Sequence, residues 1–208
     1  MIKKFSILIA AIAAMFVGTP VSADDVIETD ISVVSRYVWR GSSEATSISL
    51  QPSATLPIES NVGLTSINVW GNVPWSGNDT EYNFSFTQSI NDIGSIGITS
   101  YYYDGAFLDG DSHDLEVGIS SSLKGISLFA GRFVKGDDVK NDTYVEIGYV
   151  LDGINFHIGA GDGSYVDDGD GFALVNLGLS VSNDDGYGVS LIYNPDSEAV
   201  FFVVSKNW

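Results

Sequence analysis

Two arginines and three glutamates are the residues of this sequence whose types and spacing could do electrostatic work together. Arg36 and Arg40 are four positions apart in an alternating segment, so both would point to the same side of a strand. Glu81, Glu116 and Glu146 hold polar positions in three later segments of the same kind. Because an enclosed charge must be paired or hydrated, we expect these side chains to face one common interior.

Such a set of charges supports two interpretations. One is a structural network that fills a narrow interior, in which each arginine is neutralised by a carboxylate. The other is a charged constriction that selects solutes by the sign of their charge, as rings of Arg or Glu do in pores. The sequence does not show which carboxylate meets which arginine, so both interpretations remain open.

The two histidines give little support for catalysis. His157 holds a polar position of its segment, and we expect it to line the interior with the glutamates, with no serine beside it. His113 stands between Ser112 and Asp114, but adjacent residues of a strand point to opposite faces. A nucleophile, a base and an orienting group are therefore not brought together, and we predict a protein that is not an enzyme and uses no cofactor.

Two acidic segments, 104–111 and 162–170, are rich in Asp and Gly. A calcium ion takes six to eight oxygen ligands in a defined cage, and neither segment has the spacing of an EF-hand. Solvated loops are the simpler interpretation, so we predict no metal site. Loose binding of divalent ions that bridge to lipopolysaccharide phosphates remains the alternative.

Repeating alternating runs must position these residues. Each run has about ten residues, alternates apolar with small or polar side chains, and ends at Gly, Asp or Asn, which is typical of β-strands. In 153–161, for example, Phe156 and Ile158 alternate with Asn155 and His157. We predict twelve strands, with ten or fourteen as neighbouring possibilities. The runs are 28–40, 46–57, 61–71, 80–90, 94–103, 112–122, 125–134, 142–150, 153–161, 172–182, 186–193 and 198–208.

The connections between these runs alternate between two kinds. The tight ones are 58–60, 91–93, 123–124, 151–152 and 183–185. The longer ones are 41–45, 72–79, 104–111, 135–141, 162–171 and 194–197. This alternation is typical of an all-β, up-and-down antiparallel barrel of the outer membrane, with short turns on the periplasmic side. A soluble exported β-protein is disfavoured, because so many apolar faces would overfill its interior.

Aromatic residues gather near the ends of the predicted strands that adjoin the longer connections. We expect most of them to form an interfacial girdle facing lipid, with ordinary core packing as the alternative. This would turn Tyr37 and Trp39 outward. The residues are Tyr37, Trp39, Trp70, Trp75, Tyr101 to Tyr103, Phe133, Tyr165, Phe172 and Tyr193.

Two predicted strands fit the alternation poorly. In 125–134, placing Arg132 inward also turns Ile126 and Leu128 inward. In 61–71 the apolar phase changes between Leu64 and Ile67, which suggests a bulge.

The N-terminal residues have the layout of a secretory signal peptide. A basic start, Met1–Lys4, precedes an apolar run, 5–17, and a cleavage site of small residues that ends at Ala23. The run is shorter than the roughly 20 residues of a spanning helix. We predict that residues 1–23 are removed on export and that 24–208 form the barrel, with an uncleaved anchor as the alternative.

The charge balance excludes one class of partner. All 27 acidic residues follow residue 23, and so do seven of the nine Lys and Arg residues. Seven positive against 27 negative charges give the mature chain a formal charge of −20. Nucleic acid is therefore not an expected partner, because binding phosphates requires clustered cations. The absence of cysteine leaves no disulfide to stabilise the exported chain.

The C-terminal run resembles the signal by which bacterial outer-membrane proteins are recognised by the barrel-assembly machinery. Trp208 holds the place of the terminal aromatic residue, with Val204 and Phe202 on the same face. Lys206 departs from this pattern, because an apolar residue is usual there. The resemblance implies that the assembly machinery, outer-membrane lipids and lipopolysaccharide are partners.

The first run resembles the opening strand of the TorF-like putative porins of Gram-negative bacteria. The matching positions are Ser35, Tyr37, Arg40 and Gly41, followed by Gln51-Pro52. The resemblance implies a small outer-membrane barrel with presumed pore-forming activity. We therefore expect passive diffusion of small solutes or ions through a narrow, charged interior. A closed structural or surface-interaction barrel without transport remains the alternative.

Overall fold

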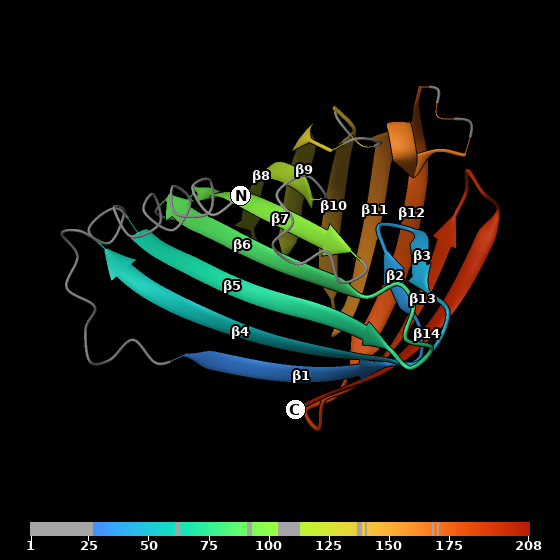
Figure 1. The fold of residues 1–208 in the computed structure, drawn as a ribbon, viewed down its shortest axis with the longest axis horizontal. Coiled ribbons are helices and arrows are strands. Elements are labelled where there is room, and N and C mark those ends of the chain that lie inside the picture. Colours follow the sequence, from blue (N-terminus) through green and yellow to red (C-terminus); the bar gives the residue numbers. More distant parts are fainter. Residues whose placement is uncertain are drawn as a thin grey trace.

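The computed structural model describes residues 27–60, 63–90, 93–103, 113–136, 139, 141–167, 169 and 171–208. Across these residues, twelve antiparallel strands close into one barrel, which confirms the predicted all-β antiparallel barrel and its strand number (Figure 1). The strands of the barrel are β1 (Glu28–Val34), β4 (Ser49–Ser60), β5 (Gly63–Pro74), β6 (Glu81–Ile90), β7 (Gly94–Tyr103), β8 (His113–Leu123), β9 (Ile126–Lys135), β10 (Thr143–Leu151), β11 (Ile154–Asp162), β12 (Phe172–Ser182), β13 (Tyr187–Asn194) and β14 (Ala199–Asn207).

Two of the segments for which the sequence made predictions are not among the residues that the structure describes. The predicted signal peptide, 1–23, and the acidic segment 104–111 lie outside the described residues. Within the described part, no helix is long and apolar enough to span a bilayer. A single turn of 3₁₀-helix, η1 (Gly163–Tyr165), precedes β12.

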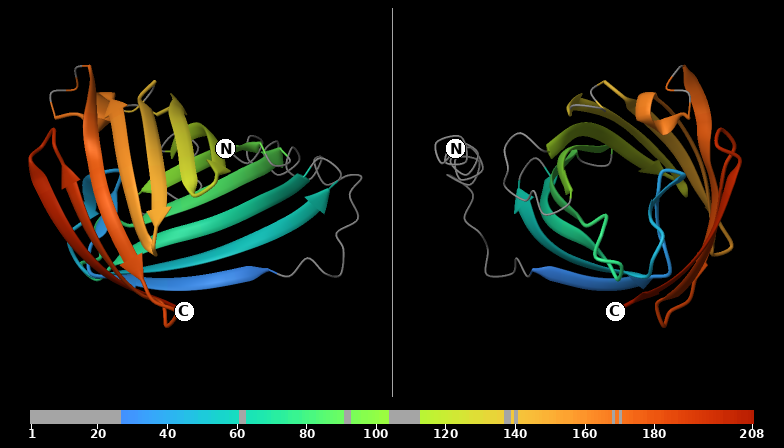
Figure 2. Two further views of the ribbon diagram at one scale, coloured as in Figure 1. Left: turned by 180° about the vertical axis from the view of Figure 1, so that it is seen from behind. Right: turned by 45° about the vertical axis from the view of Figure 1, so that its right-hand side comes forward.

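Two strands do not belong to the barrel wall. β2 (Tyr37–Trp39) and β3 (Ser42–Ala45) form an antiparallel hairpin in the connection from β1 to β4. Seen along the barrel, this hairpin lies inside the ring of strands (Figure 2). The prediction of one strand over 28–40 is therefore wrong, because the barrel strand ends at Val34.

Apolar side chains cover the outside of the barrel. Partners directly across neighbouring strands share a face, and Ile147 lies between Leu128 and Ile158, all three of them exposed. Such rows continue around the wall and fit a membrane barrel. The alternate positions are small or polar, as where Ser95 of β7 pairs with Ser120 of β8.

Two of the tight turns at one end of the barrel connect neighbouring strands through only two residues. Lys124 and Gly125 have φ angles of 53° and 81°, and Asp152 and Gly153 have φ angles of 50° and 81°. Two consecutive positive φ angles define the type I′ turn, whose twist matches that of the flanking strands. These two-residue turns join β8 to β9 and β10 to β11.

The structure corrects the two strands that fitted poorly. Arg132 pairs with Val117 and Thr143 on the outer face, in phase with the exposed Ile126 and Leu128. Arg132 therefore points outward. The bulge expected in 61–71 is wrong, because β5 pairs in unbroken register with β4 and β6.

Candidate functional site inside the barrel

The candidate site is built by the hairpin β2–β3, which leaves the wall at Ser35. The Ser35 backbone N–H donates to the Val204 carbonyl at 2.8 Å, and the Val204 N–H donates to Ser35 Oγ at 2.9 Å. The serine side chain thus replaces a backbone acceptor of the sheet where the chain turns inward. The tip residues Arg40 and Gly41 have φ angles of 49° and 86°, as a type I′ turn requires.

Gly41 anchors the tip of the hairpin against the opposite wall. A Cβ atom at this position would lie 1.9 Å from the Val175 carbonyl oxygen of β12, so no larger residue fits without displacement. The Asn194 side-chain amide of β13 donates to the Gly41 carbonyl at 3.2 Å. The tip is therefore fixed by backbone contacts that do not depend on the Arg40 side chain.

Arg40 extends from this tip to a carboxylate on β8. Its two terminal nitrogens donate to the two oxygens of Glu116 at 2.6 and 2.9 Å, which is a bidentate ion pair. Glu116 also accepts a hydrogen bond from the Tyr101 hydroxyl at 2.8 Å. The Tyr165 hydroxyl accepts a further bond from Arg40 at 2.6 Å. The charge of Arg40 is thus balanced within the site.

Aromatic rings surround the same guanidinium. Its central carbon lies 4.3 Å from the ring centroid of Trp39, 4.7 Å from that of Tyr144 and 4.9 Å from that of Phe129. Such distances are typical of cation–π contacts. The hairpin-filled half of the interior is therefore dense with rings and paired charge. Its residues are Tyr37, Trp39, Arg40, Trp70, Tyr101, Glu116, Phe133, Tyr144 and Tyr165.

This cluster corrects the predicted aromatic girdle. Tyr37 packs against Trp70 in a tilted arrangement with ring centroids 5.4 Å apart, and Trp39 packs on Tyr101, Phe133 and Tyr165 inside the barrel. These six rings do not face lipid, because they pack around a hairpin that the alternation did not reveal. The members of the predicted girdle that are exposed include Trp75, Phe172 and Tyr193.

A second polar group lies beside the first. Glu146 of β10 accepts hydrogen bonds on Oε2 from the Tyr144 hydroxyl at 2.6 Å and from the Asn176 amide at 3.2 Å. The Asn176 side-chain oxygen lies 3.2 Å from Nε2 of His157 on β11. The structure thus brings the predicted residues Glu146 and His157 together. It does so through Asn176 and Tyr144, which the sequence interpretation missed although both hold interior positions of their strands.

Glu81 and Arg36 bond to neither the Arg40–Glu116 pair nor Glu146, and Glu81 bonds instead to Tyr37 at the start of the hairpin. Glu81 is buried at the start of β6 and accepts a hydrogen bond from the Asn83 side chain at 2.7 Å. Arg36 precedes the hairpin, and its guanidinium lies 5.7 Å from the ring centroid of Phe201. The expectation that Arg36 and Arg40 share one strand is wrong, because the chain bends between β1 and β2.

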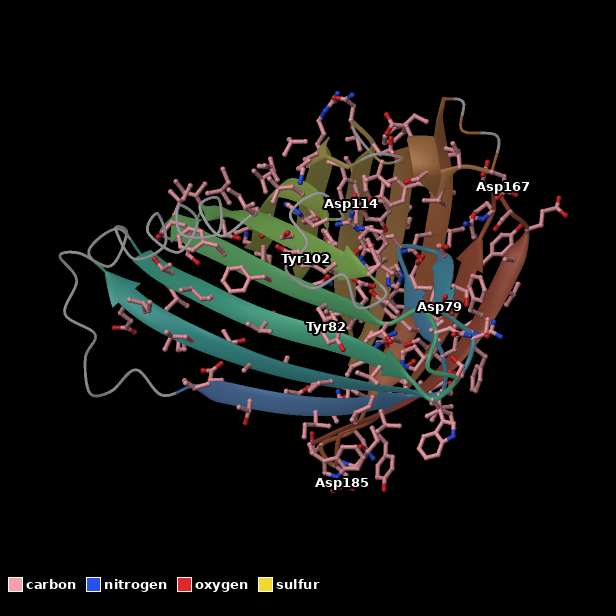
Figure 3. All side chains as sticks on the ribbon, viewed as in Figure 1. Asp79, Tyr82, Tyr102, Asp114, Asp167 and Asp185 are labelled. Carbon is pink, nitrogen blue, oxygen red and sulfur yellow. The ribbon has the colours of Figure 1, made fainter. Side chains whose placement is uncertain are left out.

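Glu44 on β3 is a further carboxylate of the hairpin. Burial raises the pKa of its carboxyl group, and repulsion from Asp79 acts in the same direction. Asp79 belongs to the β5–β6 connection and is labelled beside the hairpin in Figure 3. The sequence interpretation did not select Glu44, because the segment 41–45 was expected to be an outer connection.

Two cavities lie among the described residues of the interior. One, of about 340 Å³, is lined by Trp39, Arg40, Phe129, Tyr144, Glu146, His157 and Asn176, among others. The other, of about 640 Å³, is lined mainly by serines of β6 to β9, and its lining also includes Phe129 and Glu146. The serine-lined half of the interior is defined by Ser89, Ser95, Ser120, Ser122 and Ser127. Phe129 and Glu146 therefore border both cavities.

The residues of the predicted assembly signal lie on the outer face. Phe202, Val204 and Trp208 are exposed. Lys206 lies over the rings of Tyr187 and Trp208, 4.9 and 4.7 Å from their centroids, and donates to the Asp185 carbonyl at 2.5 Å. Figure 3 labels Asp185 at the end of the barrel near the C-terminus. Lys206, which breaks the apolar pattern, is thus held against the turn between β12 and β13. Long basic side chains at membrane interfaces behave in the same way, with the stem on apolar surface and the charge at polar groups.

Comparisons with known proteins add no assignment, since neither a family model nor a curated protein matches this sequence.

Proposed function

We propose that this protein is an outer-membrane pore for passive diffusion of small solutes or ions, in which the hairpin β2–β3 is the constriction. The observation that carries the proposal is the pair of cavities, about 340 and 640 Å³, that both border Phe129 and Glu146 inside a barrel with an apolar exterior. The hairpin β2–β3 narrows the interior, and Glu146 still lines both cavities. The resemblance of the segment 31–41, which leads from β1 into the hairpin, to TorF-like putative porins agrees with this function.

The outer-membrane location rests on the exterior and on the sequence. Exposed apolar rows suit lipid, and the predicted signal peptide would deliver the chain across the inner membrane. Lipids and lipopolysaccharide would then surround the wall, and the assembly machinery would recognise Phe202, Val204 and Trp208. Nothing in the proposed transport requires a cofactor or a catalytic residue.

A closed structural barrel is the second candidate, and the anchored tip favours it. Gly41 is pressed against β12 and Arg40 is fully paired, so the hairpin could act as a permanent plug. The two candidates differ in whether ions pass.

The deciding experiment is single-channel conductance of refolded 24–208 in a planar bilayer. The expected result is steady, small conductance that increases in Arg40→Ala, because the guanidinium lies at the narrow part. Arg132→Ala is the matched control, since Arg132 faces outward, and its conductance should equal that of the wild type. Folding is verified by the heat-sensitive gel mobility of each protein. Silence from a folded wild type would favour the plug.

A further inference from the structure

We propose that Glu146 and the rings of Trp39, Phe129 and Tyr144 form a binding site for small organic cations. The inference rests on the proposed function and deepens it, because it names the class of solute that the constriction favours. The site occupies the cavity of about 340 Å³ beside the hairpin tip.

The first argument is the charge of the site. Arg40 and Glu116 neutralise each other through a bidentate ion pair. Glu146 is left with neutral donors, Tyr144 and Asn176, and no Lys or Arg of the described residues forms an ion pair with it. Two carboxylates and one guanidinium leave one negative charge, which one monovalent cation would balance. An anion would be repelled by this net negative charge.

The second argument is the surface that surrounds this carboxylate. Three of the residues lining the cavity are aromatic, and ring faces attract cations. These rings already hold one cation in the folded chain, the Arg40 guanidinium, at 4.3 to 4.9 Å. A partly desolvated ammonium group gains from the rings and from the carboxylate together, whereas a hydrated metal ion would gain less from the rings.

The third argument is access. Both hydrogen bonds to Glu146 end on Oε2, so among the described residues Oε1 has no side-chain donor that would compete with a ligand. The carboxylate borders the serine-lined cavity as well as the hairpin cavity. A cation arriving through the serine-lined half meets hydroxyl groups, such as the Ser95 and Ser120 pair, and the residues that line this cavity include no Lys or Arg. The charge of −20 on the mature chain would concentrate cations near both ends of the barrel.

The test is calorimetric titration of refolded 24–208 in detergent with tetramethylammonium chloride. The expected result is saturable binding that weakens about tenfold or more in Glu146→Gln, because a partly buried charge contact is lost. Glu198→Gln is the matched control, since Glu198 is exposed in the β13–β14 connection, and its affinity should be unchanged. Uncharged tert-butanol should not bind.

A second variant guards against a folding defect in Glu146→Gln. Phe129→Leu removes one ring and keeps the carboxylate, and it should weaken tetramethylammonium binding several-fold. The proposal is overturned if both variants bind like the wild type, or if tert-butanol binds as well as tetramethylammonium.

Conductance measured in a potassium chloride gradient separates this proposal from the pore function. If the wild type binds tetramethylammonium but passes no current, the binding site is supported and the pore function is refuted. If the wild type conducts, and Glu146→Gln matches it in tetramethylammonium affinity and in cation preference, the pore function stands and the binding site is refuted. Cation preference that is reduced in Glu146→Gln supports both.

Discussion

The two halves of the barrel interior share the same strands and differ in what fills them. In the hairpin-filled half, Trp39 and Arg40 of the hairpin pack against rings of β7, β9 and β10, and Arg40 pairs with Glu116 of β8. In the serine-lined half, side chains such as Ser95 and Ser120 bond to each other at 2.6 Å and leave a cavity of about 640 Å³. The same wall therefore supports dense packing at one end and open space at the other, and the difference comes from one inserted hairpin.

This difference predicts that substitutions in the two halves affect the unfolding free energy to different extents. Large effects on unfolding are expected where the hairpin is paired and packed, because buried polar groups there depend on each other. Small effects are expected among the serines, whose hydroxyl groups can turn toward water. Variants in the two halves can therefore test the comparison directly.

The largest effect is expected from Glu116→Gln. The variant leaves the Arg40 guanidinium without its bidentate partner in a site where both side chains are at most 10% exposed. Breaking such a pair costs about 3–5 kcal/mol of unfolding free energy. Urea unfolding in lipid vesicles measures the loss. Arg40→Met/Glu116→Leu removes both charges, and it should recover most of that stability; equal loss in the double variant would contradict the ion-pair account.

The next effect is expected from Gly41→Ala, which forces the hairpin tip away from Val175. A φ of 86° disfavours a side chain, and the added Cβ would also collide with the carbonyl of β12. Together these should cost about 2–4 kcal/mol and raise conductance. Gly77→Ala is the control, because Gly77 has a φ of 78° with open space around it, and only the backbone cost of about 1–2 kcal/mol applies.

A smaller effect of opposite sign is expected from Glu44→Gln. Because burial raises the pKa of Glu44 in the folded state, the folded protein holds this proton more tightly than the unfolded chain does. This group therefore lowers the stability of the wild type as pH rises above the ordinary carboxyl pKa, and the variant lacks this contribution. Unfolding followed from acid to neutral pH should show equal stability in acid and a more stable variant at neutral pH. A constant difference across that range would exclude the titration.

The smallest effect is expected from Ser120→Ala in the serine-lined half. The Ser95 hydroxyl loses its partner but remains next to a large cavity, so the unfolding free energy should change by less than about 0.5 kcal/mol. Urea unfolding and conductance should both match the wild type. A loss comparable to that of Gly41→Ala would mean that the two halves do not differ in the way described.

The sequence by itself determined the wall. The period-2 alternation predicted twelve strands, and the predicted bounds of 94–103 and 172–182 equal those observed for β7 and β12. The strand predictions succeeded because side chains on a strand alternate between two faces, and the composition of each face reports its surroundings. The same alternation led to the expectation that Glu116, Glu146 and His157 face one common interior.

The tertiary structure alone decided the contents of the interior. The alternation of 28–40 continues from the barrel strand into β2, because a hairpin strand and a wall strand have the same period. The point at which the chain turns inward depends on distant contacts: Ser35 with β14, Gly41 with β12, and Arg40 with β8. Those contacts join residues that are remote in the chain, and a local pattern carries no information about them.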